Sequence, residues 1–308
     1  MLKLFTNRNF ILILSLVLGF FLGDYTASLA SVSAWVLAFV MIFATTGFSF
    51  TNWKPVGKTI RIIGFSFLLN FVIFGLLLFA AGLILFEDKL MITGILLLVI
   101  SPPGPSVIPF TAAMKGNVSF AVTGVFGLHL ISIIVTPVAL LLLPGNSNIS
   151  VQSVLSIITT VIVVPLIISR ILRRTPFMTA IEKIRGHIIN WGFFIIIMPI
   201  VGMSKSIIMA QPVMVLLNSL LFAVVMFGGG LIFNIVAGKM RVDQPTTIAA
   251  NLIFTTKSSA FAAVVSFSLV PPEASIPLAM HAVFVTLYFI VFDFIINKKR
   301  KSSFIEKE

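Results

Sequence analysis

The chain has 308 residues, of which 59% are hydrophobic and 10% charged, whereas about 25% are charged in an ordinary soluble domain, so lipid is the expected solvent for most of its surface. The formal net charge of +12 does not indicate nucleic-acid binding, because the basic residues lie between apolar runs rather than along one polar face. The absence of cysteine excludes disulfides, thiolate metal sites and cysteine nucleophiles.

Ten apolar runs, of 15 to 27 residues, are interpreted as membrane-spanning helices, which need roughly 20 apolar residues. They cover residues 9–23, 31–50, 60–85, 90–115, 117–143, 151–170, 187–204, 212–238, 246–270 and 275–296. The first run resembles a signal peptide, but Gly23-Asp24 is a poor cleavage site and further spans follow, so we interpret it as the first span. The sequence therefore predicts an all-α integral membrane protein with ten transmembrane helices.

The distribution of Lys and Arg predicts the orientation of these spans, because cytoplasmic loops retain basic residues. Loops on one side of the predicted bilayer and the two ends of the chain carry eighteen of the 21 basic residues. The opposite loops carry only Lys89 and Lys205, and the remaining residue, Lys257, lies inside the ninth span. We therefore expect both termini on the cytoplasmic side of the cell's inner (plasma) membrane.

The chain divides into two sets of five spans. Residues 1–143 hold the first set, 144–150 form a linker rich in Pro, Gly, Asn and Ser, and 151–297 hold the second set, before a basic tail at 298–308. Because five is odd, the second set must run with inverted topology. We therefore predict two inverted five-helix repeats.

The fourth and ninth spans are both interrupted. The fourth contains Ser101-Pro-Pro-Gly-Pro105, and the ninth contains Thr255-Thr-Lys-Ser-Ser259. A proline kink is the simpler explanation of the first, but three prolines remove three backbone donors and constrain the residues before them. Interrupted helices in corresponding positions of two halves point to a transporter's binding site. We expect helices four and nine to be discontinuous and to cross in mid-membrane.

The unwound segments predict a polar binding site. Half-helices that restart near Ser106 and Ser258 would present free amides and a partial positive charge, which favour an anion. The other residues expected to line this site come from the same two breaks and are Pro103, Gly104, Pro105, Thr255, Thr256 and Ser259.

Lys257 is the most informative single residue. An ammonium near the bilayer centre costs about 2.5 to 3.5 kcal/mol on insertion scales, and such groups usually face a cavity and a partner. A purely structural role is the alternative, in which the side chain snorkels to the interface or holds the broken helix through carbonyl oxygens. Because desolvation disfavours a charged amine, Lys257 could also carry the proton in a coupled cycle.

Other polar residues inside spans are weaker candidates. Asn70 would lie near the cavity if the third span lines it, but an isolated Asn often only bonds a neighbouring helix. His129 could relay protons or simply pack. The sequence contains no metalloprotease, P-loop, nucleophile-elbow or paired-carboxylate motif. No span carries the repeated polar residues that line a water-filled pore. We therefore expect neither an enzyme nor a channel, with no catalytic residue, cofactor or bound metal.

Several segments resemble the bile acid:sodium symporter family. Ser101-Pro-Pro-Gly-Pro-Ser106 followed by Lys115-Gly-Asn117 is similar to its Pro-Gly-Gly break and basic-Gly-Asn turn. Gly47-Phe-Ser-Phe50 and Lys257-Ser-Ser-Ala-Phe-Ala-Ala263 resemble its Gly-Leu-x-Leu and Asn-Ser-Gly-Leu-Ala stretches. The resemblance implies a panel domain of spans one, two, six and seven, a core domain of spans three to five and eight to ten, and elevator-like alternating access.

The positions that supply sodium ligands in that family differ in this chain. The resemblance implies a Ser-Asn pair after the break, hydroxyls on helix five, Gln on helix three, and Glu with Gln on helix nine. The matching positions hold Val107 and Ile108, Ala121 and Val125, Asn70, and a stretch without an acid between Asp243 and Glu273. We therefore expect Lys257 to replace bound sodium, in a sodium-independent secondary transporter of a small organic anion.

The sequence leaves two other functions open. The first is a sodium-coupled organic anion symporter whose site is rebuilt from Asn70, Asn251, Thr255, Thr256 and backbone carbonyls. The second is a receptor or scaffold that binds a ligand without transporting it, although a scaffold has no need for two unwound helices.

Overall fold

The computed structural model describes residues 6–47, 55–141 and 151–305, and all regular structure in these ranges is helical. Seven helical runs there are long and apolar enough to cross a bilayer, namely Val56–Leu85, Val118–Leu140, Leu155–Leu172, Met178–Ser206, Pro212–Lys239, Gln244–Phe267 and Glu273–Lys298. Shorter apolar helices cover Phe10–Leu22, Ala30–Thr46 and Lys89–Val99. The chain is thus an all-helical, multi-pass membrane protein.

The first half of the chain contains five groups of helices. They are α2 (Arg8–Leu22) with the 3₁₀ turn η1 (Gly23–Leu29), α3 (Ala30–Thr46), the continuous run of α4 (Val56–Phe67), η3 (Leu68–Phe74) and α5 (Gly75–Leu85), the pair α6 (Lys89–Val99) and α7 (Val107–Ala113), and α8 (Val118–Leu141). The segment η3 is a π-helical turn.

The second half contains the remaining described helices. It contains α9 (Val151–Ile158), η4 (Thr159–Val163) and α10 (Val164–Leu172), then α11 (Met178–Ala210), then α12 (Pro212–Phe222), η5 (Ala223–Gly228) and α13 (Gly229–Lys239), then α14 (Gln244–Thr255) and α15 (Ser259–Leu269), and finally η6 (Pro272–Ser275) with α16 (Ile276–Ile305). The turns η4 and η5 are also π-helical.

Some helices extend beyond the predicted spans. α11 begins at Met178 rather than at residue 187, and α16 continues through most of the predicted tail to Ile305. Charged residues end an apolar run without ending a helix, because Lys, Arg and Glu are good helix formers. The predicted end of the second span at 48–50, the linker 144–150 and residues 306–308 lie outside the described residues.

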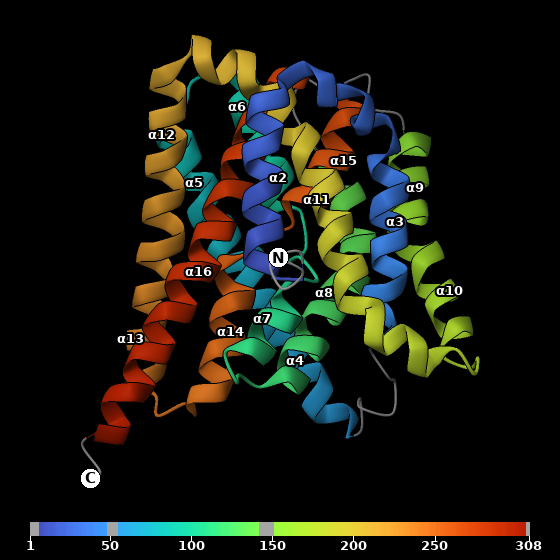
Figure 1. Cartoon of the computed structure of the whole chain (residues 1–308). Coiled ribbons are helices and arrows are strands. Elements are labelled where there is room, and N and C mark those ends of the chain that lie inside the picture. Colours follow the sequence, from blue (N-terminus) through green and yellow to red (C-terminus); the bar gives the residue numbers. More distant parts are fainter. Residues whose placement is uncertain (1–5, 48–54, 142–150, 306–308) are drawn as a thin grey trace.

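Two packing groups are evident. α11 packs against α2 and α3, and α10 packs against α3. In the other group, α14 contacts α7, α8, α13 and η3, while α6 contacts α5, α15 and α16. Figure 1 shows α6 and α15 in the upper half of the molecule and α7 and α14 in the lower half, so the four half-helices are arranged around mid-height.

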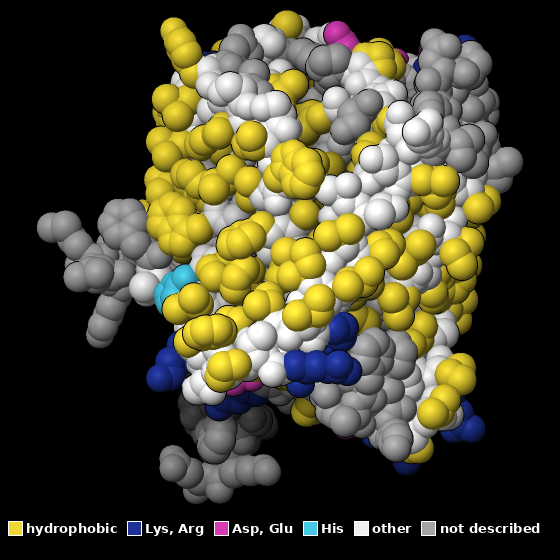
Figure 2. All heavy atoms as spheres, turned by 90° about the vertical axis from the view of Figure 1, so that its right-hand side faces the viewer, with side chains coloured by type: hydrophobic (Ala, Val, Ile, Leu, Met, Phe, Trp, Pro, Cys, Tyr) yellow, Lys and Arg dark blue, Asp and Glu magenta, His cyan; other side chains and the backbone are white. Residues whose placement is uncertain are grey.

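The surface has the distribution of side chains that a bilayer requires. Along α12 and α13, large apolar side chains such as Val213, Leu216 and Leu231 are more than half exposed. Figure 2 shows a broad hydrophobic band, with most of the visible Lys and Arg side chains gathered below it. Exposed apolar residues at this density are expected against lipid rather than water.

Candidate functional site

The two interrupted helices meet at their breaks. α6 ends at Val99 and α7 begins at Val107, while α14 ends at Thr255 and α15 begins at Ser259. Ser258 caps α15, because its Oγ accepts a hydrogen bond from the Phe261 backbone N–H at 3.2 Å. The Ser258 N–H itself donates to the carbonyl oxygen of Pro102 at 2.9 Å, which joins the second break to the first.

Lys257 lies at the centre of this junction with only 2% of its surface exposed. Its Nζ donates to Asn70 Oδ1 at 2.8 Å, to the Val99 carbonyl oxygen at 2.8 Å and to the Ser101 carbonyl oxygen at 3.2 Å. An ammonium has three protons, so all three are satisfied by neutral oxygens. The Nζ also lies 4.3 Å from the centre of the Phe71 ring, within cation–π range.

Asn70 connects the third predicted span to the second break. It lies in the π-helical turn η3 and is fully buried. Its Nδ2 donates to the carbonyl oxygens of Ile253 at 2.7 Å and Thr256 at 2.9 Å, while its Oδ1 accepts from Lys257. Single π turns are frequent at functional sites. The Asn70 amide therefore links the end of α14 to the Lys257 ammonium.

The two threonines before Lys257 are buried but bond within their own helix. Thr255 Oγ1 donates to the Asn251 carbonyl oxygen at 2.9 Å, and Thr256 Oγ1 donates to the Leu252 carbonyl oxygen at 2.6 Å. These hydroxyls stabilise the last turn of α14, and within the described part of the chain neither is hydrogen-bonded to the Lys257 ammonium.

Asn251 lies one turn before them and also bonds neighbouring helices. Its Nδ2 donates to the Gly230 carbonyl oxygen at 2.9 Å and to Asn234 Oδ1 at 3.1 Å, both on α13. Its Oδ1 accepts a hydrogen bond from the Tyr288 hydroxyl on α16. The amide thus ties α14 to α13 and α16.

A small pocket of about 50 Å³ lies beside the junction. It is lined by Gly104, Ser106, Lys257, Ser258 and Ser259, together with residues of α2, α11 and α16. Pro103 and Pro105 are buried next to it. A side chain at Gly104 would crowd the pocket, because its Cβ would lie 3.1 Å from Ser106 Oγ.

Sequence reasoning did not identify His281, which lies next to this pocket. Its Nδ1 is 2.7 Å from Ser259 Oγ, and its ring meets Phe222 edge-on. Its Nε2 is buried and has no hydrogen-bond partner among the described residues. The signal in the sequence that could have identified His281 is its position, as an ionisable residue inside the predicted span 275–296.

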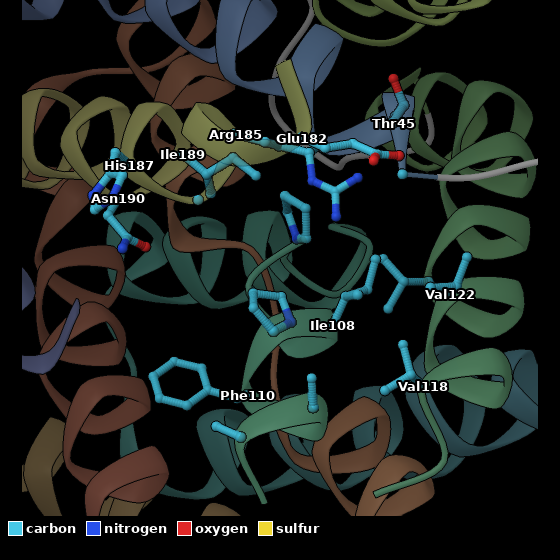
Figure 3. Close-up of a pocket in the computed structure, with 18 of the residues that line it drawn as sticks. Thr45, Ile108, Phe110, Val118, Val122, Glu182, Arg185, His187, Ile189 and Asn190 are labelled. Carbon is cyan, nitrogen blue, oxygen red and sulfur yellow. The ribbon is translucent and has the colours of Figure 1, made fainter. Parts of the chain in front are cut away.

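A larger cavity of about 750 Å³ lies toward the basic end of the molecule (Figure 3). It contacts the first break through Pro105 and Ile108, and α11 contributes Arg185 and Asn190. His129 lines this cavity rather than the small pocket, and its Nδ1 is hydrogen-bonded to the Val125 carbonyl oxygen at 2.8 Å. The structure therefore separates His129 from Lys257 and the other residues at the junction.

The Lys115-Gly116-Asn117 turn joins α7 to α8 and contacts the start of α14. Asn117 caps α8 by accepting from the Phe120 N–H at 3.0 Å, and its Nδ2 donates to Thr246 Oγ1 at 3.0 Å. Lys115 has a positive φ of 53°. The turn thus fixes the end of one interrupted helix against the beginning of the other.

At the positions where the resemblance implies sodium ligands, Asn70 is the polar side chain, Ile108 is half-buried, and three apolar side chains are buried. Val107 and Ala121 have no exposed surface, and Val125 is 2% exposed. Among the described residues, no group of three or more His, Asp or Glu side chains could hold a metal ion.

A model of the sodium bile acid symporter family matches residues 34–211, more than half of the chain. This match confirms the resemblance, and it includes the first break, whereas Lys257 lies beyond it. No curated protein matches the chain. Members of the family are transporters rather than enzymes. Together with its apolar helices, the match assigns the chain to the membrane transporters of bile acid or organic anion type, and it belongs to the sodium bile acid symporter family.

Proposed function

We propose that the protein is a secondary active transporter that moves a small organic anion by alternating access, with the Lys257 ammonium in place of a bound sodium ion. The observation that carries this proposal is the oxygen environment of Nζ, which consists of one amide oxygen and two carbonyl oxygens freed by the first break. Unwound carbonyls of this kind coordinate sodium in transporters with broken helices. A tethered ammonium supplies the same single positive charge.

The hydrogen bonding of the neighbouring residues argues against a rebuilt sodium site. Asn70 Oδ1 already accepts from Lys257, and Asn251 Oδ1 accepts from Tyr288. The hydroxyls of Thr255 and Thr256 donate within α14. A sodium ion would have to displace the ammonium to gain Asn70 Oδ1, which makes the sodium-coupled symporter the second candidate.

The charge at the junction favours an anion as the transported solute. Lys257 bears a positive charge among neutral oxygens, and the N-terminus of α15 adds a partial positive charge beside it. An anion that enters the small pocket would meet both. If Lys257 releases its proton during the cycle, transport becomes proton-linked and follows a pH gradient.

The proposal includes ten spans in two inverted repeats. In its support, predicted spans three and eight both contain a π-helical turn, and spans four and nine are both interrupted. The proposed panel and core domains would move relative to each other and carry the site across the membrane, and the packing of α11 against α2 and α3 supports this division. The basic end of the molecule is proposed to face the cytoplasm, with both termini on that side of the inner membrane.

Uptake by proteoliposomes tests the proposal. We expect wild-type protein to take up organic anions from a panel of carboxylates equally well with and without a sodium gradient. Lys257→Ala should abolish uptake, and uptake by Lys257→Arg would show that charge alone suffices. Lys205→Ala is the matched control, because Lys205 lies away from the breaks, where its Nζ donates to the Phe21 carbonyl oxygen at 3.4 Å and lies 5.8 Å from the centre of the Phe20 ring.

Three outcomes would redirect the proposal. Sodium-stimulated uptake by wild-type protein would favour the sodium-coupled symporter. Undiminished uptake by Lys257→Ala would remove the role of the lysine. Binding without counterflow of a labelled anion would identify a receptor rather than a transporter.

A further inference from the structure

One face of α11 lines the larger cavity. Glu182, Arg185, Gly186, Ile189 and Asn190 all contact it, and their spacing of three, four, seven and eight residues from the first places them on a single helical face. Asn190 lies about 7.5 Å deeper along the helix axis than Arg185, at about 1.5 Å per residue. The cavity therefore has two polar groups at different depths on the same wall.

Asn190 is 9% exposed, and its amide makes no hydrogen bond to any described residue. Figure 3 shows the side chain pointing from α11 toward the cavity. Because this amide lines the cavity and bonds no described residue, its oxygen and nitrogen are available to a ligand that enters the cavity.

Arg185 is half-buried, and its guanidinium also lacks a hydrogen bond or ion pair within the part of the chain that the structure describes. It lies directly over Gly47, where an added Cβ would collide with it. Glu182, Lys183 and Asp293 are the other charged residues of the cavity, and neither carboxylate pairs with Arg185. The guanidinium is therefore free to meet an anion entering the cavity.

The facing wall is apolar. It is formed by Ile108 on α7 and by Val118, Val122 and Phe126 on α8. A volume of about 750 Å³ is in the range of pockets that enclose most of a small organic molecule. The small pocket beside Lys257 holds only about 50 Å³, so the body of such a molecule fits the larger cavity and not the smaller one.

We propose that Arg185 and Asn190 form a substrate-recognition subsite on α11. This rests on the proposed function and specifies how the organic anion is bound. Arg185 pairs with the carboxylate of the anion, Asn190 hydrogen-bonds a second polar atom deeper in the cavity, and the apolar body lies against α7 and α8. The subsite selects the solute, whereas Lys257 supplies the fixed charge at the breaks.

The test compares Arg185→Gln with Lys183→Gln, a matched control that removes one positive charge from the neighbouring residue of the same cavity. The probes are carboxylates with apolar bodies of increasing size, such as octanoate and 4-phenylbutyrate, each paired with its primary amide. We expect Arg185→Gln to raise the KM for carboxylate uptake about tenfold, the loss of one charge-assisted pair, and to leave kcat within about twofold. Lys183→Gln should change the KM less than about twofold.

Asn190→Leu separates recognition from folding. Because the amide bonds no described residue, the apolar replacement should leave the melting temperature unchanged or higher, yet raise KM severalfold. An equal KM effect of Lys183→Gln, or no effect of Arg185→Gln and Asn190→Leu, would overturn the subsite while anion transport itself stood. Failure of wild-type protein to take up any carboxylate would instead refute the proposed function and the subsite with it.

Discussion

The two breaks interrupt their helices by different means. Between α6 and α7, Pro102, Pro103 and Pro105 remove backbone donors without contributing any ionisable group. Between α14 and α15 there is no proline, and the interruption consists of Thr256, Lys257 and the capping residue Ser258. The first break is therefore rich in acceptors and the second is rich in donors.

The comparison explains why the breaks meet. Val99 and Ser101 offer carbonyl oxygens to Lys257, and Pro102 offers its carbonyl oxygen to the Ser258 N–H. Unpaired backbone groups are costly in a membrane interior, so each break satisfies the groups that the other leaves open. Neither interruption is favourable alone, and substitutions can disturb one of the two breaks at a time.

The largest effect is expected for Lys257→Ala, which leaves three buried oxygens without a donor. We expect uptake to fall at least about 100-fold, equivalent to roughly 2.7 kcal/mol. Small cations should restore part of it, because sodium or methylammonium can occupy the vacated position among Asn70 Oδ1 and the two carbonyls. Choline is the control cation, since it is too large for that position. Absence of rescue in protein that remains monodisperse would show that the lysine does more than supply charge.

An intermediate effect is expected from replacing Pro102, Pro103 and Pro105 together with Ala. Each proline disfavours a continuous helix by about 3 kcal/mol relative to Ala, so the triple variant can extend α6 and withdraw carbonyls from Lys257. Anion uptake should fall about tenfold. Pro199→Ala is the control, because Pro199 lies inside the continuous helix α11 and its replacement should leave uptake unchanged. Unaltered uptake in the triple variant would mean that Lys257 and Ser258 maintain the break unaided.

The smallest effect is expected at the cap of α15. Ser258→Ala removes the hydrogen bond to the Phe261 N–H and should cost about 1 kcal/mol, seen as a melting temperature lower by a few degrees. Ser266→Ala is the matched control on the same helix, because the buried Ser266 hydroxyl bonds nothing in the described part of the chain and its loss should be neutral or stabilising. Equal destabilisation by both substitutions would contradict a specific role for the cap.

The positions of both breaks could be predicted because their causes are local. Prolines remove donors wherever they occur, and an ammonium inside an apolar run requires polar partners. The partners themselves were only partly predictable. The Asn70 side chain can be identified as a polar candidate from the sequence. The carbonyl oxygens of Val99 and Ser101 become partners of Lys257 only when distant helices pack together.

The α11 subsite escaped prediction for a related reason. Arg185 lies in a basic stretch that was interpreted as a loop, whereas the helix continues through it from Met178. Asn190 lies inside a predicted span, but its significance depends on the cavity opposite it. Hydropathy marks where a chain enters lipid and carries no information on which helix face borders a cavity.

The π-helical turn at Leu68–Phe74 has a consequence for comparing this chain with its relatives. A π turn accommodates one additional residue without breaking the helix, which rotates everything after it by about 100° relative to an uninterrupted α-helix. A relative without this insertion would align correctly with α4 and α5 only if a one-residue gap were opened in the middle of the helix. Deleting a residue here would swing Asn70 away from α14 or turn the lipid-facing side of α5 inward.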